Sequence, residues 1–164
     1  MGEYEYVVHE FEPVYDTSSR ILILGSIPSV KSRETGFYYG HPQNRFWKVI
    51  AALTQEEVPQ DIPEKKRVLL EHQIAIWDVI HSCRIRGSSD SSIRDVVPND
   101  IEGLLKKTHI QRLYANGTKA YELYQKYMYP QTQVEIVRLP STSPLNATWD
   151  LQKLTAYWGE KLQI

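Results

Sequence analysis

The sequence predicts an α/β fold, a three-layer sandwich in which helices cover both faces of a central four-stranded parallel sheet. Three observations lead to this prediction. Four short apolar runs alternate with segments of helical spacing, the order of strands and helices in parallel sheets. The runs are continuously apolar, as in strands buried on both faces. A length of 164 residues suits one domain, residues 1–164, with a substantial core.

Turn residues bound the four apolar runs. The first run ends in Gly25, the second contains one charged residue, Asp78, and the third closes at Asn116-Gly117, a common turn pair. The strands are expected at residues 21–25, 73–80, 110–115 and 134–139. Residues 84–95 are polar and rich in Gly and Ser, so we expect an ordered loop or a mobile lid there.

Five segments have the features of helices. Residues 44–54 carry a broad apolar face. Residues 63–72 begin with proline and place Glu64 in their first turn, which suits a helix N-terminus. Residues 99–108 end near two lysines, where cations suit the helix dipole. The remaining helices are expected at 118–128 and 151–162.

Charge and composition exclude several classes of protein. With 19 Lys and Arg against 20 Asp and Glu, the net charge is −1, so a nucleic-acid face must be a local basic patch. Its candidates are Arg84, Arg86, Lys106, Lys107 and Lys119. The single cysteine, Cys83, excludes a disulfide framework, a cysteine zinc site and a four-cysteine iron–sulfur cluster. With no leader pattern and no apolar run near about 20 residues, we expect a soluble, cytoplasmic protein without a membrane partner.

Two loops at strand ends contain the residues that suit catalysis. The first loop holds GSIPS, residues 25–29, and then TGFYYGHPQNRFW, residues 35–47; the second is LPSTSPLNA, residues 139–147. Because both follow strands of one parallel sheet, they are expected to meet at its carboxyl edge. The aromatic rings can stack on a flat ring, and the amides can orient a water molecule. The pairing predicts an enzyme that handles a nucleobase.

These motifs resemble those of a known family. GSIPS and the aromatic segment after it resemble the first motif of the uracil-DNA glycosylase superfamily, especially its mismatch-specific uracil/thymine branch. LPSTSPLNA is similar to the superfamily's Pro-Ser loop, which presses into the DNA minor groove. The motifs together most closely resemble the hypoxanthine-DNA (deoxyinosine) glycosylase branch. The resemblance implies a four-stranded parallel sheet, double-stranded DNA with a damaged base as the partner, and no metal or cofactor. We expect a monomer.

The first loop departs from the family at one position. The mismatch-specific branch has a catalytic Asn where this chain has Ile27, a side chain that can neither hold nor polarise water. The resemblance to the deoxyinosine branch implies that Asn44 holds the attacking water instead, through orientation by its amide carbonyl. The alternative is that Asn44 only caps the helix that follows it. Both roles are compatible.

The resemblance also assigns a base-binding group. Tyr39 aligns with the aromatic residue that stacks on an extruded base, a contact worth about 1–3 kcal/mol. The alternative for Tyr39 is packing in the core. Ser26 and Ile27 belong to the same group, and His41 is a candidate donor to the base or a phosphate, or a residue that only shapes the turn before Pro42.

Asp78 is a charged residue within an apolar strand, which is costly unless it is paired or faces a site. The superfamily has its base-reading Asn at the corresponding strand end, so Asp78 is a candidate reader of the purine edge, where hypoxanthine offers an N1–H. The alternative is an ion pair with Arg84 or Arg86. Because the family's electrophilic histidine before the Pro-Ser step is absent, stabilisation of the departing base falls to backbone donors, Asp78 or His41.

The second loop is predicted to bind DNA. Ser141 and Ser143 suit contacts to phosphates, and Leu145 resembles the apolar wedge that enters the base stack. Asn146 is assigned to the same DNA-binding group. The alternative is an ordinary turn between a strand and a helix, with Asn146 as the helix cap.

The sequence therefore predicts a monofunctional DNA glycosylase that acts on deoxyinosine in base excision repair. Neither loop core holds a lysine for a Schiff base, although Lys31 is near. Uracil opposite guanine is the second candidate substrate. A catalytically silent DNA-binding protein and an enzyme of free nucleosides are the alternatives.

Overall fold

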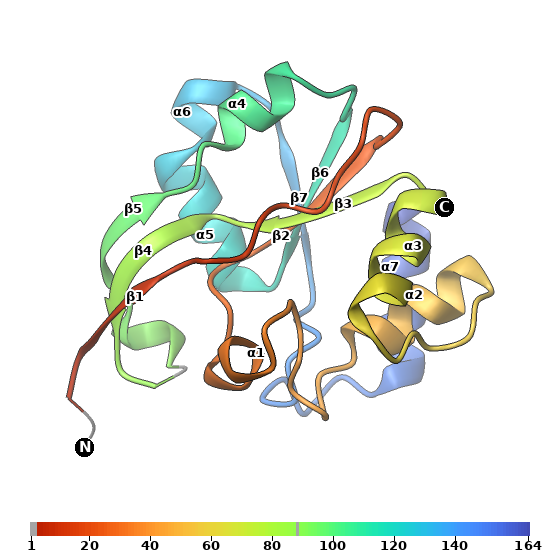
Figure 1. The fold of residues 1–164 in the computed structure, drawn as a ribbon, viewed down its shortest axis with the longest axis horizontal. Helices are drawn as coiled ribbons and strands as arrows, with labels where there is room; N and C mark the ends of the chain where they lie inside the picture. Colours follow the sequence, from red (N-terminus) through yellow and green to blue (C-terminus); the bar gives the residue numbers. More distant parts are fainter. Residues whose placement is uncertain (1–2, 88) are drawn as a thin grey trace.

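The computed structural model describes residues 3–87 and 89–164, and its centre is the predicted four-stranded parallel sheet (Figure 1). The strand order is β3-β2-β6-β7. These strands are β2 (Ile21–Gly25), β3 (Ile74–Asp78), β6 (Arg112–Asn116) and β7 (Ile136–Leu139). β2 lies between β3 and β6, so the chain adds β3 on one side of β2 and then β6 and β7 on the other side. Their carboxyl ends form the crevice where open α/β sheets bind ligands.

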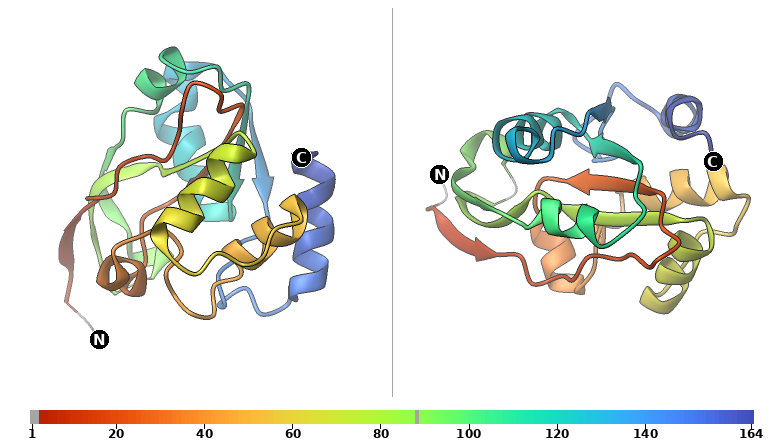
Figure 2. Two further views of the ribbon diagram at one scale, coloured as in Figure 1. Left: turned by 45° about the vertical axis from the view of Figure 1, so that its right-hand side comes forward. Right: turned by 90° about the horizontal axis from the view of Figure 1, so that it is seen from above.

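Helices cover both faces of the sheet, as the sequence predicts (Figure 2). On β2, Ile21 and Ile23 face one core cluster whereas Leu22 and Leu24 face the other. The first cluster includes α2 (Phe46–Thr54), α3 (Ile62–Glu71) and α7 (Leu151–Leu162). The second includes α4 (Ile101–Lys106) and α5 (Thr118–Tyr127). All nine predicted elements are present, with ends that differ by two residues or fewer.

A second, antiparallel sheet was not expected from the sequence. It has the order β1-β4-β5, formed by β1 (Glu5–Val8), β4 (Ile80–Ile85) and β5 (Arg94–Pro98). The strand predicted at 73–80 therefore leaves the parallel sheet after Asp78. The prediction of a loop at 84–95 is wrong over most of its length, because these residues contribute to β4, η1 (Asp90–Ser92) and β5. Ser88 lies outside the described residues.

Short helices and caps complete the chain. The remaining helices are α1 (Val30–Thr35), in the first loop, and α6 (Tyr129–Thr132) after α5. Asp61, Asp100 and Asp150 cap α3, α4 and α7 with their carboxylates, as N-cap residues do. No helix in the described part of the chain is long and apolar enough to cross a membrane.

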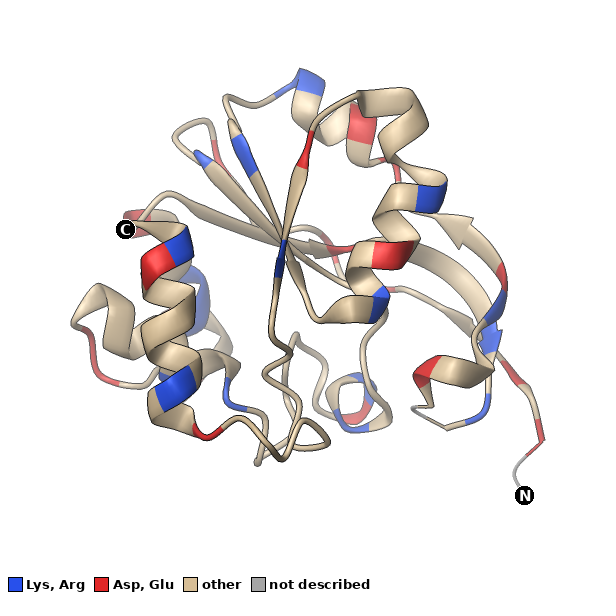
Figure 3. Ribbon diagram, turned by 180° about the vertical axis from the view of Figure 1, so that it is seen from behind, with Lys and Arg blue, Asp and Glu red and all other residues tan. Residues whose placement is uncertain are grey.

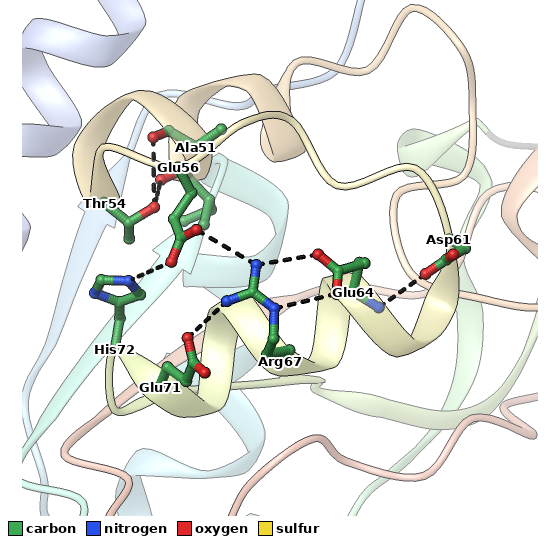
Figure 4. Close-up of polar contacts among 9 residues, drawn as sticks. Ala51, Thr54, Glu56, Asp61, Glu64, Arg67, Glu71 and His72 are labelled. Carbon is green, nitrogen blue, oxygen red and sulfur yellow. Dashed lines mark hydrogen bonds and ion pairs between the residues drawn. The ribbon is translucent and has the colours of Figure 1, made fainter.

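An exposed ion-pair cluster fixes the segment between α2 and α3 to α3 (Figure 4). The Arg67 guanidinium contacts the carboxylates of Glu56, Glu64 and Glu71 at 2.6–3.3 Å. His72 lies 3.1 Å from Glu56. The hydrogen bonds from His72 and Arg67 lower the pKa of the Glu56 carboxyl. None of these residues lines the cavity described below. The cluster is therefore a suitable place for control substitutions.

Candidate active site

A cavity of about 660 Å³ opens at the carboxyl edge of the parallel sheet. The loops after β2, β6 and β7 line it together with the end of β3. The predicted site residues on its wall are Ser26, Ile27, Tyr39, Asn44, Asp78, Ser141, Ser143, Leu145 and Asn146. The fold thus gathers nearly all the predicted residues at one place, although they come from segments more than 100 residues apart.

His41 is the exception. It is not among the residues that line the cavity, and its Nδ1 accepts the backbone N–H of Gln43 at 3.1 Å. The geometry agrees with the alternative in which His41 shapes the turn.

Asn44 belongs to a hydrogen-bonded chain that joins the two loops to β6. Its Oδ1 accepts the Thr142 hydroxyl at 2.8 Å and the Phe46 backbone N–H at 2.9 Å. The Thr142 Oγ1 in turn accepts from the Asn116 Nδ2 at 3.1 Å, and the Asn116 Oδ1 accepts the Thr142 backbone N–H at 3.0 Å. We call Asn44, Thr142 and Asn116 the water-positioning network, after the role argued for it below.

Backbone donors fix the direction of every bond in the water-positioning network. The Thr142 N–H can only donate, so Asn116 must place its oxygen there and its amide nitrogen on the Thr142 hydroxyl. That hydroxyl must then give its proton to Asn44. Two donors occupy the Asn44 oxygen, so its two amide N–H groups are left for the cavity. Asn44 therefore binds the first residue of α2, as the capping alternative holds, and presents donors to a ligand at the same time.

This differs from the expectation that the Asn44 carbonyl orients a water molecule. The carbonyl has two lone pairs, and the Thr142 hydroxyl and the Phe46 N–H take both. The nitrogen is the atom of Asn44 that is available to a water oxygen.

Arg45 holds the second loop against the first, a role that sequence reasoning missed. Its guanidinium donates to the carbonyls of Thr142 and Ser143, at 3.3 and 2.7 Å, and to those of Asn146 and Trp149. Its backbone N–H also binds the Thr142 carbonyl at 3.1 Å. A signal was visible in the sequence, because Arg45 is the only Lys or Arg in TGFYYGHPQNRFW.

Tyr39 lies on the wall of the cavity in an uncommon backbone conformation. Its φ is +55°, the left-handed region that residues other than Gly rarely adopt. One face of the ring stacks on Phe46, with centroids 4.0 Å apart and planes inclined by 20°. Its hydroxyl is buried and, within residues 3–87 and 89–164, forms no hydrogen bond of full geometry. Burial, and after it the nearby Asp78, raises the pKa of the Tyr39 hydroxyl well above its usual range, although the nearby Asn116 side chain acts to lower it, so the hydroxyl stays protonated.

Asp78 is paired with a residue that the sequence did not point to. Its Oδ2 lies 2.8 Å from the Nε2 of His9, and both side chains are almost fully buried. The expected alternative, an ion pair with Arg84 or Arg86, is wrong. Arg84 pairs with Asp95 at 3.5 Å, and the Arg86 guanidinium lies over the ring of Tyr4. We call Tyr39, Asp78 and His9 the base-reading group, after the role proposed below; Tyr39 and Asp78 line the cavity, and His9 does not.

The second loop is folded by its own side chains. The Ser141 and Ser143 hydroxyl oxygens accept the backbone N–H groups of Ser143 and Leu145 at 3.1 and 3.2 Å, which leaves the hydroxyl protons to donate outward. The Asn146 amide donates to the Ser141 carbonyl at 3.0 Å. The alternative in which Asn146 caps the following helix is wrong, because Asp150 is that cap. Leu145 is 85% exposed at the cavity mouth, which is unusual for a leucine.

Few charged side chains surround the cavity. Residues 140–149 contain none, and Figure 3 shows that loop without a coloured segment while Lys, Arg, Asp and Glu are interspersed elsewhere. Of the predicted basic candidates, only Lys119 lines the cavity; Arg138, which was not predicted, also lines it. Lys31 does not, and lies 3.6 Å from Glu34. The described residues contain no cluster of His, Cys, Asp and Glu that could hold a metal ion.

Comparisons with known proteins agree with this geometry. Residues 12–161 match the model of the uracil DNA glycosylase superfamily. A hypoxanthine DNA glycosylase of Methanosarcina acetivorans is 39% identical over 140 residues, which cover 83% of this chain and 86% of that protein. A protein of the same name from Methanosarcina barkeri is 33% identical, covering 92% and 94%.

A solved structure shares the fold. It is a solution NMR structure from M. acetivorans, described under the name uracil DNA glycosylase, with a TM-score of 0.79 and 31% identity over 93% of this chain and 94% of that one. The family model covers nearly the whole chain, and the solved structure has the same fold. The chain therefore belongs to the uracil DNA glycosylase superfamily.

Proposed function

We propose that this protein is a DNA glycosylase that hydrolyses the N-glycosidic bond of deoxyinosine and leaves an abasic site. The observation that carries the proposal is the cavity itself, where an aromatic ring, a carboxylate and the free amide N–H groups of Asn44 meet. The relatives named hypoxanthine DNA glycosylase support the choice of base. A base must leave the duplex to reach such a cavity.

Tyr39 and Asp78 of the base-reading group bind the extruded base. The face of Tyr39 that Phe46 does not cover stacks on the purine, replacing the neighbours that the base loses on leaving the duplex. The Asp78 carboxylate accepts the N1–H of hypoxanthine. Ser26 and Ile27 form the part of the wall next to it. Ile27 contributes shape alone, because its side chain has no polar atom.

The water-positioning network holds the nucleophile. Asn44 donates an amide N–H to the oxygen of a water molecule below the sugar. As the bond between C1′ and the base nitrogen breaks, positive charge develops on the sugar, and the water oxygen bonds to C1′. The attacking water gives up one proton to solvent, and the departing base takes up one proton from solvent, so the step balances as a hydrolysis. A sugar that already carries positive charge needs a placed water more than a strong base, so a fixed amide suffices.

The second loop engages the duplex. The hydroxyls of Ser141 and Ser143 donate to phosphates, and exposed Leu145 fills the gap that the extruded base leaves in the stack. Asn146 acts on DNA indirectly, by holding the Ser141 carbonyl. We further propose that the enzyme works as a monomer, on double-stranded DNA and in the cytoplasm. Gel filtration with and without a duplex tests the first of these points.

Base release tests the proposed function. Labelled duplexes carry one deoxyinosine or one deoxyuridine and are read as strand breaks with and without alkali. We expect release of hypoxanthine, with breaks only after alkali because no Schiff base forms. Asn44→Ala should lower the rate constant at least about 100-fold, since a misplaced reactant costs about that much. Arg67→Ala, in the exposed cluster, is the control and should leave the rate unchanged.

Other outcomes would point to the alternatives. Release of uracil opposite guanine in preference to hypoxanthine would keep the family and change the substrate. The N3–H of uracil supports this second candidate, because Asp78 could accept it in the same way. Binding without release of either base would indicate a silent DNA-binding protein. Equal turnover of free deoxyinosine would indicate a nucleoside enzyme.

A further inference from the structure

The buried contact between His9 and Asp78 has no part in the mechanism above. We propose that His9 is a positioning residue that makes Asp78 a fixed hydrogen-bond acceptor, and that the pair distinguishes a deaminated base from its amino parent. The inference rests on the proposed function and deepens it, because it names the atom of the base that is read. It assigns a role to a residue of the N-terminal segment, which does not line the cavity.

The fold fixes Asp78 from several directions. Its backbone pairs with Gly25 on β2, and its carbonyl accepts the buried Asn99 amide at 2.9 Å. Its Oδ2 contacts His9, whereas its Oδ1 lies over Gly25, where a Cβ atom would come within 2.3 Å of it. Among the described residues no donor reaches Oδ1. This oxygen is therefore the one that Asp78 can offer to a ligand in the cavity that it lines.

The surroundings of His9 make it a donor. Its ring packs against the rings of Phe11 and Tyr38, with centroids 5.6 and 5.8 Å away, and its side chain has no exposed surface. Its Nδ1 is buried and has no hydrogen-bond partner in residues 3–87 or 89–164. A buried N–H without an acceptor is costly, so the proton belongs on Nε2, where Asp78 accepts it. The Tyr38 and Tyr39 hydroxyls lie near enough to feel the Asp78 charge, and burial, the larger cause, raises the pKa of both, so both stay protonated; the Tyr38 hydroxyl donates to the Glu12 carbonyl at 2.8 Å.

A fixed acceptor can recognise deamination. Adenine N1 and cytosine N3 are acceptors, whereas hypoxanthine N1 and uracil N3 carry a proton. A carboxylate oxygen in front of this ring position binds the N–H of the deaminated base and repels the lone pair of the normal one. A carboxylate without a fixed direction could turn away from this ring position, and the distinction would weaken. His9 holds Oδ2 and thereby fixes the direction in which Oδ1 points.

Single and double substitutions at the two positions separate the role of His9 from that of Asp78. His9→Leu removes the donor, and His9→Gln keeps an amide N–H that can reach Asp78. Asp78→Asn is the sharper variant. His9 would hold the amide oxygen of Asn, so the amide nitrogen would face the base and favour adenine N1. Adding His9→Leu to Asp78→Asn frees the amide to turn over and should restore preference for hypoxanthine.

Equilibrium binding to duplexes with 2′-fluoro-deoxyinosine or 2′-fluoro-deoxyadenosine tests the inference, because the fluorine suppresses cleavage. The quantity compared is the Kd for the adenosine duplex divided by the Kd for the inosine duplex. We expect this ratio to fall at least about tenfold in His9→Leu and in Asp78→Asn, since unpaired polar groups carry such discrimination. The ratio should stay within about threefold of the wild type in His9→Gln, and recover in the double variant. His81→Gln, an exposed histidine on β4, is the matched control.

Unfolding curves identify variants that do not fold. An unchanged ratio in folded His9→Leu, or no recovery in the double variant, would overturn the role of His9. Wild-type release of hypoxanthine together with that result would leave the proposed function intact. If the wild type releases no base, the proposed function fails, and the Kd ratios still decide whether His9 acts through Asp78.

Discussion

The water-positioning network lines the same cavity as Tyr39 and Asp78 of the base-reading group, but the two sets of residues differ in how their buried polar atoms are paired. In the network, the Asn44 oxygen has two donors, and Asn116 and Thr142 bind each other through both side-chain and backbone atoms. In the base-reading group, the Tyr39 hydroxyl and the His9 Nδ1 are buried, and the described part of the chain gives neither a partner.

The difference indicates separate tasks. A network whose bonds are all made holds one geometry, which suits a water molecule that must lie at one point when the bond breaks. Buried polar atoms without partners are costly, so each one calls for an explanation. On this account the internal bonds of the water-positioning network are made before DNA binds, whereas the base supplies the missing partner of the Asp78 Oδ1.

Thr142→Val tests the water-positioning network and has the largest expected effect. Valine keeps the shape but removes the hydroxyl between Asn116 and Asn44, so the Asn44 amide is free to turn. We expect the rate constant of base release to fall about 100-fold, with about 1–3 kcal/mol lost in the free energy of unfolding. Single-turnover assays and denaturant unfolding measure these. Thr142→Ser restores the hydroxyl and should recover most of the rate; failure to do so would contradict the account.

Gly25→Ala tests the base-reading group from the backbone side. The new Cβ would lie 2.3 Å from the Asp78 Oδ1 and 3.1 Å from the Tyr39 hydroxyl, so both side chains must move. We expect kcat/KM for inosine duplexes to fall about 10- to 100-fold. Gly159→Ala on α7, whose Cβ would meet only the flexible end of Leu53, is the control. Equal losses in the two variants would show that the effect is general destabilisation.

Two substitutions of Tyr39 separate the contribution of its ring from that of its hydroxyl. Tyr39→Leu removes a stacking face and should weaken binding of the damaged duplex about tenfold, as expected for one base–aromatic contact. Tyr39→Phe keeps the ring and removes a buried hydroxyl without a partner, so the free energy of unfolding should rise by about 1 kcal/mol. Thermal unfolding and fluorescence anisotropy measure the two effects. A loss of stability in Tyr39→Phe would show that the hydroxyl has a partner in solution.

Lys119→Ala has the smallest expected effect, because Lys119 belongs neither to the water-positioning network nor to the base-reading group. If it contacts a phosphate, its loss should weaken binding of damaged and undamaged duplexes alike, and reduce the slope of log Kd against log salt by about one. Titrations at several salt concentrations measure this slope. A change confined to damaged DNA would instead place Lys119 with the base-reading group.

The sequence predicted the parallel sheet well because strands buried on both faces have a distinct pattern. Ile21–Gly25 and Leu151–Leu162 lie at the predicted positions. The antiparallel sheet was missed because its strands are half-exposed. Arg84 and Arg94 pair across β4 and β5 and look like loop residues in the sequence. Asp78 looked like a strand interior, but the chain changes sheets immediately after it.

The candidate site was predictable where a motif carried it. Asn44, Tyr39 and Leu145 belong to family motifs and all line the cavity. Nothing in the sequence pointed to a role for His9, because a single histidine in a polar segment reveals nothing about a partner 69 residues away. Thr142 lay within a motif, but its neighbouring serines were the more obvious candidates for DNA contacts. Tertiary contacts of this kind are outside the reach of local patterns.

The most direct test of the account is single-turnover base release from deoxyinosine and deoxyuridine duplexes by the wild type, Asn44→Ala and Asp78→Ala over a range of enzyme concentrations. The account predicts that Asn44→Ala lowers the maximal rate constant on both bases and leaves the half-saturating concentration near its wild-type value. Asp78→Ala should instead raise the half-saturating concentration for both damaged bases. If the two substitutions change the same parameter to the same extent, the division into a water-positioning network and a base-reading group is wrong.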